Sequence, residues 1–149
     1  MRYGNINVEK TKENFGVFIS AYWNARNFVR RSMKVTIQQL INEPLEDIEN
    51  YSDDSLPRKI DAKEFNYLHR LYVEGFNCIA LPSSLKNSKE RTKRRRGIFH
   101  DSYIVRLRDA ELAEKYSISL VTVKKERGDA IIQFCEALEI VVIKENEHA

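Results

Sequence analysis

Residues 108–140 read RDAELAEKYSISLVTVKKERGDAIIQFCEALEI, and this stretch decides the predicted fold. In its first half, Leu112 and Ala113 stand where a short helix faces a core, and Ala113 is small enough to let a second helix cross closely. In its second half, Ser119 is placed as an N-cap, because its hydroxyl can accept a hydrogen bond from a free backbone N–H of the next helix. The pattern predicts a helix-turn-helix whose first helix ends at Ser117 and whose second begins at Ser119.

The second of these helices is expected to have an apolar side and a polar side. Ile118 and Val123 are apolar, as burial of the turn requires. The other faces carry groups that contact phosphates and base edges when a helix enters the major groove of double-stranded DNA. Together with the Ser119 cap, these predicted DNA contacts are Thr122, Lys124, Lys125 and Arg127. The same residues also fit an ordinary helical hairpin with a solvated charged face, and that reading stays open.

Composition predicts an all-α fold. The 149 residues suffice for one domain with a core, or for a small domain with a helical extension. Charged residues make up 32% of the chain, and there are only five Gly and three Pro, which favours helices over a turn-rich sheet. We expect a helical bundle with an N-terminal packing or oligomerisation region, 1–85, and a C-terminal helix-turn-helix region, 86–149.

The sequence predicts a cytoplasmic protein. No apolar run approaches the roughly 18 residues of a membrane span, and the first residues, MRYGNINVEK, lack the apolar core of a signal peptide. Cys78 and Cys135 are isolated in the sequence, so we expect two reduced, largely buried thiols. His69 has no second ligand at a suitable spacing, and we predict neither a metal nor a cofactor.

Charge is divided along the chain although the net charge is only +3. Residues 43–54 contain six acidic side chains and no basic one, whereas residues 86–96 contain seven basic side chains and one acidic one. Such asymmetry suggests a polyanionic partner for one face. The acidic segment is expected to be a solvated surface, with two alternatives: it folds back on the basic segment, or it meets a protein partner.

Four consecutive cations, Lys93, Arg94, Arg95 and Arg96, form the densest part of the basic segment. Like charges at this density repel one another, and phosphate contact would explain their presence. A cation that neutralises a phosphate releases counterions and adds affinity without sequence preference. We therefore predict that all four contact the DNA backbone.

Two long amphipathic helices are predicted upstream. The first spans about residues 11–31, with Phe15, Ile19 and Tyr22 on an aromatic-rich stripe that either packs across the domain or forms a dimer contact. The second spans about residues 61–80, with Asp61 as its N-cap. A homodimer is expected, because a single helix-turn-helix contacts few base pairs.

Residues 94–142 resemble phage-encoded late-gene transcription regulators of the ArpU and RinA type. The likeness lies in the order of elements: a helix with Ile98, Phe99 and Tyr103, then AELAEKYSIS, then TVKK, then the helix AIIQFCEALEI. Glu126 departs from the pattern, since these families usually have an apolar residue there. The resemblance implies a helix-turn-helix like that of sigma factor region four, and a phage or prophage activator of late genes that works with RNA polymerase.

Three other function classes compete with a DNA-binding regulator. An enzyme is disfavoured, because the sequence has no glycine-rich phosphate loop, no nucleophile motif and no metal-binding His cluster. A small terminase-like subunit for DNA packaging would also carry a helix-turn-helix, and would form rings. In the third class, a protein-interaction module, the charged faces would bind a protein and not DNA.

Overall fold

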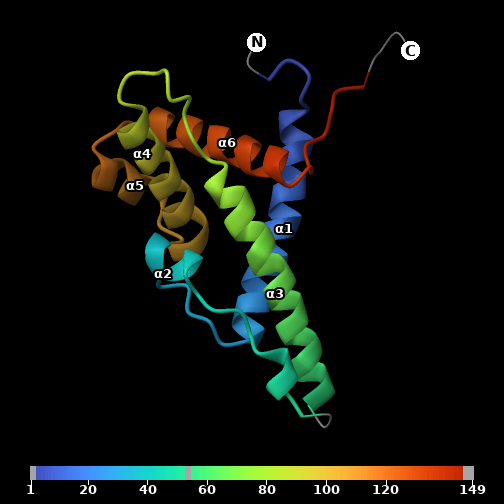
Figure 1. Ribbon diagram of the computed structural model, residues 1–149. Coiled ribbons are helices and arrows are strands. Elements are labelled where there is room, and N and C mark those ends of the chain that lie inside the picture. Colours follow the sequence, from blue (N-terminus) through green and yellow to red (C-terminus); the bar gives the residue numbers. More distant parts are fainter. Residues whose placement is uncertain (1–2, 53–54, 146–149) are drawn as a thin grey trace.

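A computed structural model gives the fold, and it describes residues 3–52 and 55–145 (Figure 1). Helices account for all the regular elements in this part of the chain, which confirms the predicted all-α class. They are α1 (Val8–Phe28), α2 (Ile37–Ile41), the 3-10 turn η1 (Ile48–Asn50), α3 (Leu56–Asn77), α4 (Ser88–His100), the π-helical turn η3 (Asp101–Val105), α5 (Asp109–Tyr116) and α6 (Leu120–Ala137). Figure 1 shows α1 and α3 side by side, with α6 crossing their upper part.

Helix α1 begins three residues before the predicted start. Asn7 is the N-cap, and its side-chain oxygen accepts a hydrogen bond from the backbone N–H of Lys10 at 3.0 Å. The helix ends at Phe28, and Arg30 adopts a left-handed backbone with φ of 61°. Capping at Asn7 supplies a partner for one of the free N–H groups of the first turn, and the helix continues through Gly16 without a break.

Helix α3 also begins earlier than predicted, at Leu56 and not at Asp61. Pro57 stands in the first turn, where proline is favoured because no intrahelical N–H bond is lost there. The prediction of Asp61 as the N-cap is therefore wrong, since Asp61 lies inside the helix. The predicted end is also corrected: α3 stops at Asn77, three residues before Ala80.

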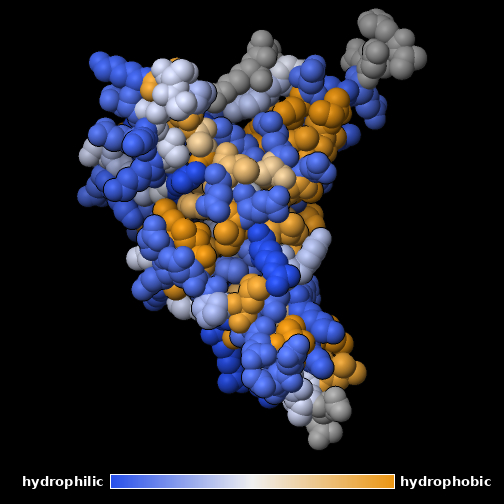
Figure 2. Space-filling model, viewed as in Figure 1, coloured by the Kyte–Doolittle hydropathy of each residue, from blue (hydrophilic) through white to orange (hydrophobic). Residues whose placement is uncertain are grey.

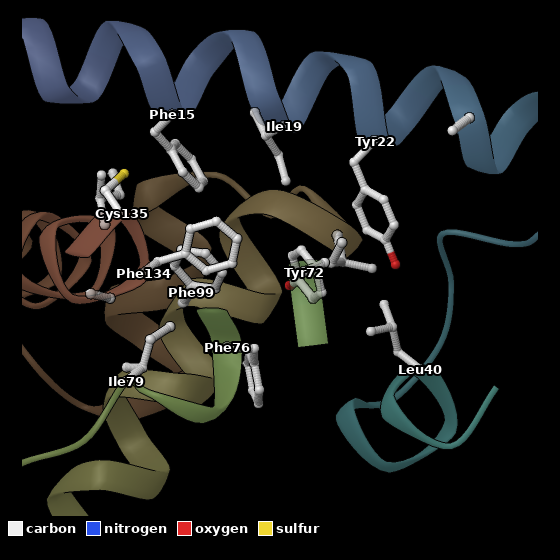
Figure 3. Packing of buried hydrophobic residues seen from close by; sticks show 14 of the residues in the cluster. Phe15, Ile19, Tyr22, Leu40, Tyr72, Phe76, Ile79, Phe99, Phe134 and Cys135 are labelled. Carbon is white, nitrogen blue, oxygen red and sulfur yellow. The ribbon is translucent and has the colours of Figure 1, made fainter. Parts of the chain in front are cut away.

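A single aromatic core joins the two predicted regions. Phe15 and Tyr22 from α1, Tyr72 from α3, Phe99 from α4 and Phe134 from α6 belong to one buried cluster (Figure 3). The Phe99 and Phe134 ring centroids lie 5.3 Å apart, and those of Phe15 and Phe134 lie 5.5 Å apart. The two regions predicted on either side of residue 85 therefore share this core.

Burial of the α1 stripe corrects the predicted dimer surface. Phe15, Ile19, Tyr22 and Ala25 are at most 3% exposed within one chain. Of the two roles that the sequence left open for this stripe, the structure shows packing across the domain. The expectation for the thiols is half right, since Cys135 is buried and Cys78 is exposed.

The acidic segment lies against the C-terminal end of α1 and not against the basic segment. The Glu43 carboxylate accepts hydrogen bonds from both terminal nitrogens of the buried Arg26, at 2.5 and 3.0 Å. Glu46 pairs with Arg31 at 3.0 Å. Asp53 and Asp54 belong to the predicted segment but lie outside the described residues. The alternative in which this segment folds onto 86–96 does not hold for the residues described.

Two glycines in helices are expected to respond oppositely to Ala. A Cβ at Gly75 would lie 2.5 Å from the Phe134 ring, so α3 and α6 would have to separate. A Cβ at Gly16 would meet nothing within 4 Å. We expect Gly75→Ala to lower the free energy of unfolding by about 1–3 kcal/mol, and Gly16→Ala to raise it by up to about 1 kcal/mol. Urea denaturation of the two variants checks this, and equal effects would contradict the close packing at Gly75.

Stability should fall as the pH drops below about 6.5. His69 is 3% exposed and hydrogen-bonded through Nδ1 to the Tyr22 hydroxyl at 2.7 Å. Burial lowers the pKa of His69 to about 4. Between that value and 6.5 the unfolded chain binds a proton that the native imidazole does not, so acid favours unfolding by up to about 1.4 kcal/mol per pH unit. His100 adds to this slope, because burial also lowers its pKa.

The matched test is His69→Gln, which removes this titrating group and keeps a polar side chain at the site. Between pH 5 and 6.5, where His69 titrates only in the unfolded chain, the variant should lose stability more gently with falling pH than the wild type does. Chemical denaturation at several pH values gives the two slopes. Parallel slopes would show that His69 titrates alike in the folded and unfolded chains.

Candidate nucleic-acid interface

Helices α5 and α6 are joined by a short connection, residues 117–119. Ser117 turns the chain in the left-handed region, with φ of 53°. The Ser119 hydroxyl accepts a hydrogen bond from the backbone N–H of Thr122 at 3.1 Å, which confirms Ser119 as the N-cap. Ile98, Leu112 and Val123 form a small buried cluster of their own beneath this turn. The α5–α6 pair therefore has a separate packing centre beside the large core.

Asp101 ties α5 to the end of α4. Its carboxylate accepts hydrogen bonds from the Tyr116 hydroxyl at 2.7 Å and from the Lys115 ammonium at 2.8 Å. The Tyr116 ring reaches Asp101 across Gly97, where a Cβ would collide with the Tyr116 hydroxyl. Burial and the bond to Asp101 raise the pKa of Tyr116, so its hydroxyl stays protonated and can donate. These contacts fix the orientation of α5, and with it the start of α6.

The first two turns of α6 present an exposed face with both apolar and basic groups. Lys124 and Lys125 are exposed, and the Lys125 side chain is 61% exposed even though its ammonium lies 3.2 Å from Asp129. Thr122 is half-buried beside them, and its hydroxyl is 2.9 Å from that of Ser119. Three of the predicted contacts therefore share one end of α6.

Two apolar residues on this face were missed by the sequence analysis. Leu120 is 50% exposed and Val121 is 77% exposed, at the first turn of α6. The sequence contained a hint: Ile118 and Val123 already suffice to bury the turn, so the two further apolar residues between them have no place in the core. Their exposure makes them candidates for contact with an apolar group of a ligand.

Arg127 is engaged within the chain. Its guanidinium donates two hydrogen bonds to the Asp109 carboxylate, at 2.5 and 3.1 Å, and the side chain is 21% exposed. This pair lowers the pKa of Asp109 and raises that of Arg127. Bidentate pairing holds the N-terminus of α5 against α6. Arg127 is thus placed to maintain the geometry of the pair, and the prediction that it contacts DNA does not fit this arrangement.

Arg95 departs most from the predicted phosphate contacts, because it is buried. Its side chain is 1% exposed, its Nε donates to Glu126 at 2.7 Å and its Nη2 donates to Asp129 at 3.3 Å. A buried guanidinium needs such partners because its removal from water is costly. This packing also gives Glu126 a structural role, since its side chain is 4% exposed against Arg95. The predicted contact of Arg95 with a phosphate is corrected to an internal ion pair.

The other three cations of the run point in different directions. Arg94 lies towards α6, 32% exposed, with Nη2 3.7 Å from Glu126. Arg96 donates to the backbone oxygens of Ile79 and Asn77, at 2.7 and 2.9 Å, and so caps the end of α3. Lys93 is exposed and, with Arg96, lines an open groove of about 600 Å³ between α2, the end of α3 and α4. The run is therefore not one continuous basic row.

Comparison with known proteins finds no match: no family, no curated protein and no solved structure matches the chain. None of the helices in the described ranges is long and apolar enough to cross a membrane. Within residues 3–52 and 55–145, no three His, Cys, Asp or Glu side chains are grouped so that they could hold a metal ion.

Proposed function

We propose that the chain is a sequence-specific, double-stranded DNA-binding transcriptional regulator that uses the first two turns of α6. The observation that carries this proposal is the exposed face on which Lys124 and Lys125 stand beside Thr122, at the start of a helix anchored by its N-cap and by the Arg127–Asp109 pair with α5. In helix-turn-helix proteins the N-terminal residues of the second helix contact base edges. Lysine and threonine side chains at that position can reach both bases and phosphates.

Leu120 and Val121 join the proposed interface as apolar contacts. The major groove offers one apolar group, the 5-methyl of thymine, and small aliphatic side chains contact it. Val121 is 77% exposed and precedes Lys124 by one helical turn, so the two side chains share a face. We therefore expect the target DNA to contain a thymine where it faces the first turn of α6.

Roles for the remaining predicted residues follow from where they lie. Arg94 and Lys93 supply sequence-independent phosphate contacts, since both retain exposed charge on or beside the α4 surface. Ser119 and Arg127 keep α6 in position and do not contact bases. The main role of Arg96 is to stabilise the end of α3, and any contact that it makes with a phosphate is a minor part of DNA binding.

The resemblance to regulators of the ArpU and RinA type supports a biological setting for this activity. We propose a phage or prophage protein that acts in the cytoplasm of its bacterial host and activates late genes together with RNA polymerase. A homodimer is part of the proposal, because two copies would contact two half-sites and so a longer sequence.

Selection from a random DNA library, followed by mobility shift at two salt concentrations, tests the proposed function. The wild-type chain should enrich a common sequence that contains thymine, and should bind it more weakly at the higher salt concentration because phosphate contacts release counterions. Failure to enrich any sequence, with no shift at low salt, would refute DNA binding. In that case the protein-interaction reading of the charged face would stand.

A further inference from the structure

Helix α3 carries apolar side chains on the side that faces away from the core. Leu56, Ile60 and Tyr67 are 58%, 54% and 58% exposed. The opposite side of the same helix packs Phe65, Tyr72 and other residues into the core. A surface helix normally presents polar groups to water on its outer side. Hydrophobic atoms are visible at the lower end of the molecule, where α3 begins (Figure 2).

The apolar residues of this outer stripe have the same spacing in both directions along α3. Leu56 and Ile60 lie four residues apart, as do Tyr67 and Leu71, and the centre of the stripe falls between Lys63 and Glu64. Residues separated by three or four positions share one helix face. If two copies of α3 paired antiparallel about this centre, each Leu56 would face Leu71 of the other copy, and each Ile60 would face Tyr67.

Charge is self-complementary in the same register. Lys63 and Glu64 are both exposed, and antiparallel pairing about the point between them sets each Lys63 opposite Glu64 of the other copy. A twofold interface requires such a match, because the same patch must fit itself. Any other partner would need its own complementary pattern, whereas a second copy of this chain supplies one.

A hollow beside the stripe gives the apolar side chains somewhere to pack. It holds about 570 Å³ and is lined by η1 and the middle of α3, including Ile48, Tyr67, Arg70 and Leu71. In the antiparallel register this half of the stripe faces Leu56 and Ile60 of the second copy. Leu56 and Ile60 are the exposed apolar side chains at the start of α3, and pairing in this register would remove them from water.

We infer that the outer face of α3 is the surface on which two copies of this chain pair, antiparallel, about a twofold axis between Lys63 and Glu64. The inference rests on the proposed homodimer and names its interface, and it does not require DNA binding. A dimer contact was one of the two roles that the sequence left open for the α1 stripe, and burial of that stripe within the monomer rules this role out.

Sedimentation equilibrium of the full chain and four variants tests the interface. Wild type should approach about twice the 17.5 kDa chain mass at micromolar concentration. Lys63→Glu places like charges opposite each other twice and should weaken the dimer about tenfold or more, whereas Lys63→Glu combined with Glu64→Lys should restore it. Ile60→Asp should weaken it about 100-fold. Val17→Asp is the control, because Val17 is 73% exposed on α1 and does not belong to the proposed α3 interface.

Each outcome bears on the inference. Restoration by the charge swap supports it directly, since a merely structural effect of Lys63→Glu would not be repaired by a second reversal. A dimer that persists in Lys63→Glu and Ile60→Asp would overturn the α3 interface and leave the homodimer in place. A monomeric wild type would overturn both, and a mass far above a dimer would favour a terminase-like ring. DNA binding by the same samples is measured separately, so its failure cannot be confused with these results.

Discussion

Replacing Arg95 with Ala is expected to lower the free energy of unfolding by about 3–5 kcal/mol. The Arg95 side chain is 1% exposed and neutralises Glu126 and Asp129, which are themselves 4% and 8% exposed. Its removal leaves two buried carboxylates without their shared guanidinium, and Lys125, which also contacts Asp129, is mostly in water. Breaking one side of a buried ion pair costs more than the pair contributes, because the remaining charge stays desolvated.

Arg94→Ala is the matched control, since it deletes the neighbouring arginine from the same helix. Its side chain is 32% exposed and its closest carboxylate oxygen is 3.7 Å away, so a loss below about 1 kcal/mol is expected. Urea denaturation of both variants gives the comparison. If Arg95→Ala unfolded like wild type and lost affinity for DNA, the internal ion pair would be wrong and the original phosphate contact would be restored.

The contrast between Arg94 and Arg95 shows where sequence reasoning stops. The four adjacent cations cannot be told apart by their chemistry in the sequence. In a helix, however, each side chain points about 100° away from the one before it. Which of them is buried depends on what packs against α4. Glu126 and Asp129, three residues apart on a helix with an apolar side, were the available sign that α6 needs a cation from elsewhere. Their partner could not be named without the fold.

Features that depend on local chemistry were predicted well. The all-α class followed from composition, and Ser119 was identified as an N-cap because capping involves only neighbouring residues. The start of α3 was missed because Asp61, followed by Glu64 three residues later, imitates a capping box, whereas the helix begins at Leu56 with Pro57 in its first turn. The true start carries a local signal of its own, because proline is favoured in the first turn of a helix.

The sequence could not choose between the two roles of the α1 stripe for a related reason. An aromatic stripe on α1 is compatible with a core or with an interface, and periodicity is the same in both cases. The structure buries that stripe and leaves the outer face of α3 uncovered. Leu120 and Val121 were overlooked in the same way, because apolar residues at the start of a helix are normally assigned to the core.

Replacing Lys124 and Lys125 together with Ala is expected to weaken binding to the selected DNA about 10- to 100-fold, if one of them contacts a base and both lie near phosphates. Folding should be nearly unaffected, because both side chains are exposed and only Lys125 has an intrachain ion pair, at 3.2 Å, in the described structure. Lys10→Ala with Lys34→Ala makes the same change in net charge at exposed positions outside α4–α6. That control should bind almost as the wild type does.

The proposed role of α6 is tested most directly by a salt titration of DNA binding by the wild type, the Lys124–Lys125 double variant and the Lys10–Lys34 control, each on the selected and a scrambled sequence. Each phosphate contact contributes about 0.9 to the slope of log affinity against log salt. Direct contact of α6 with the DNA predicts a slope shallower by about 2 and a smaller preference for the selected sequence in the α6 variant only. An unchanged slope and preference in that variant, or equal losses in the control, would contradict it.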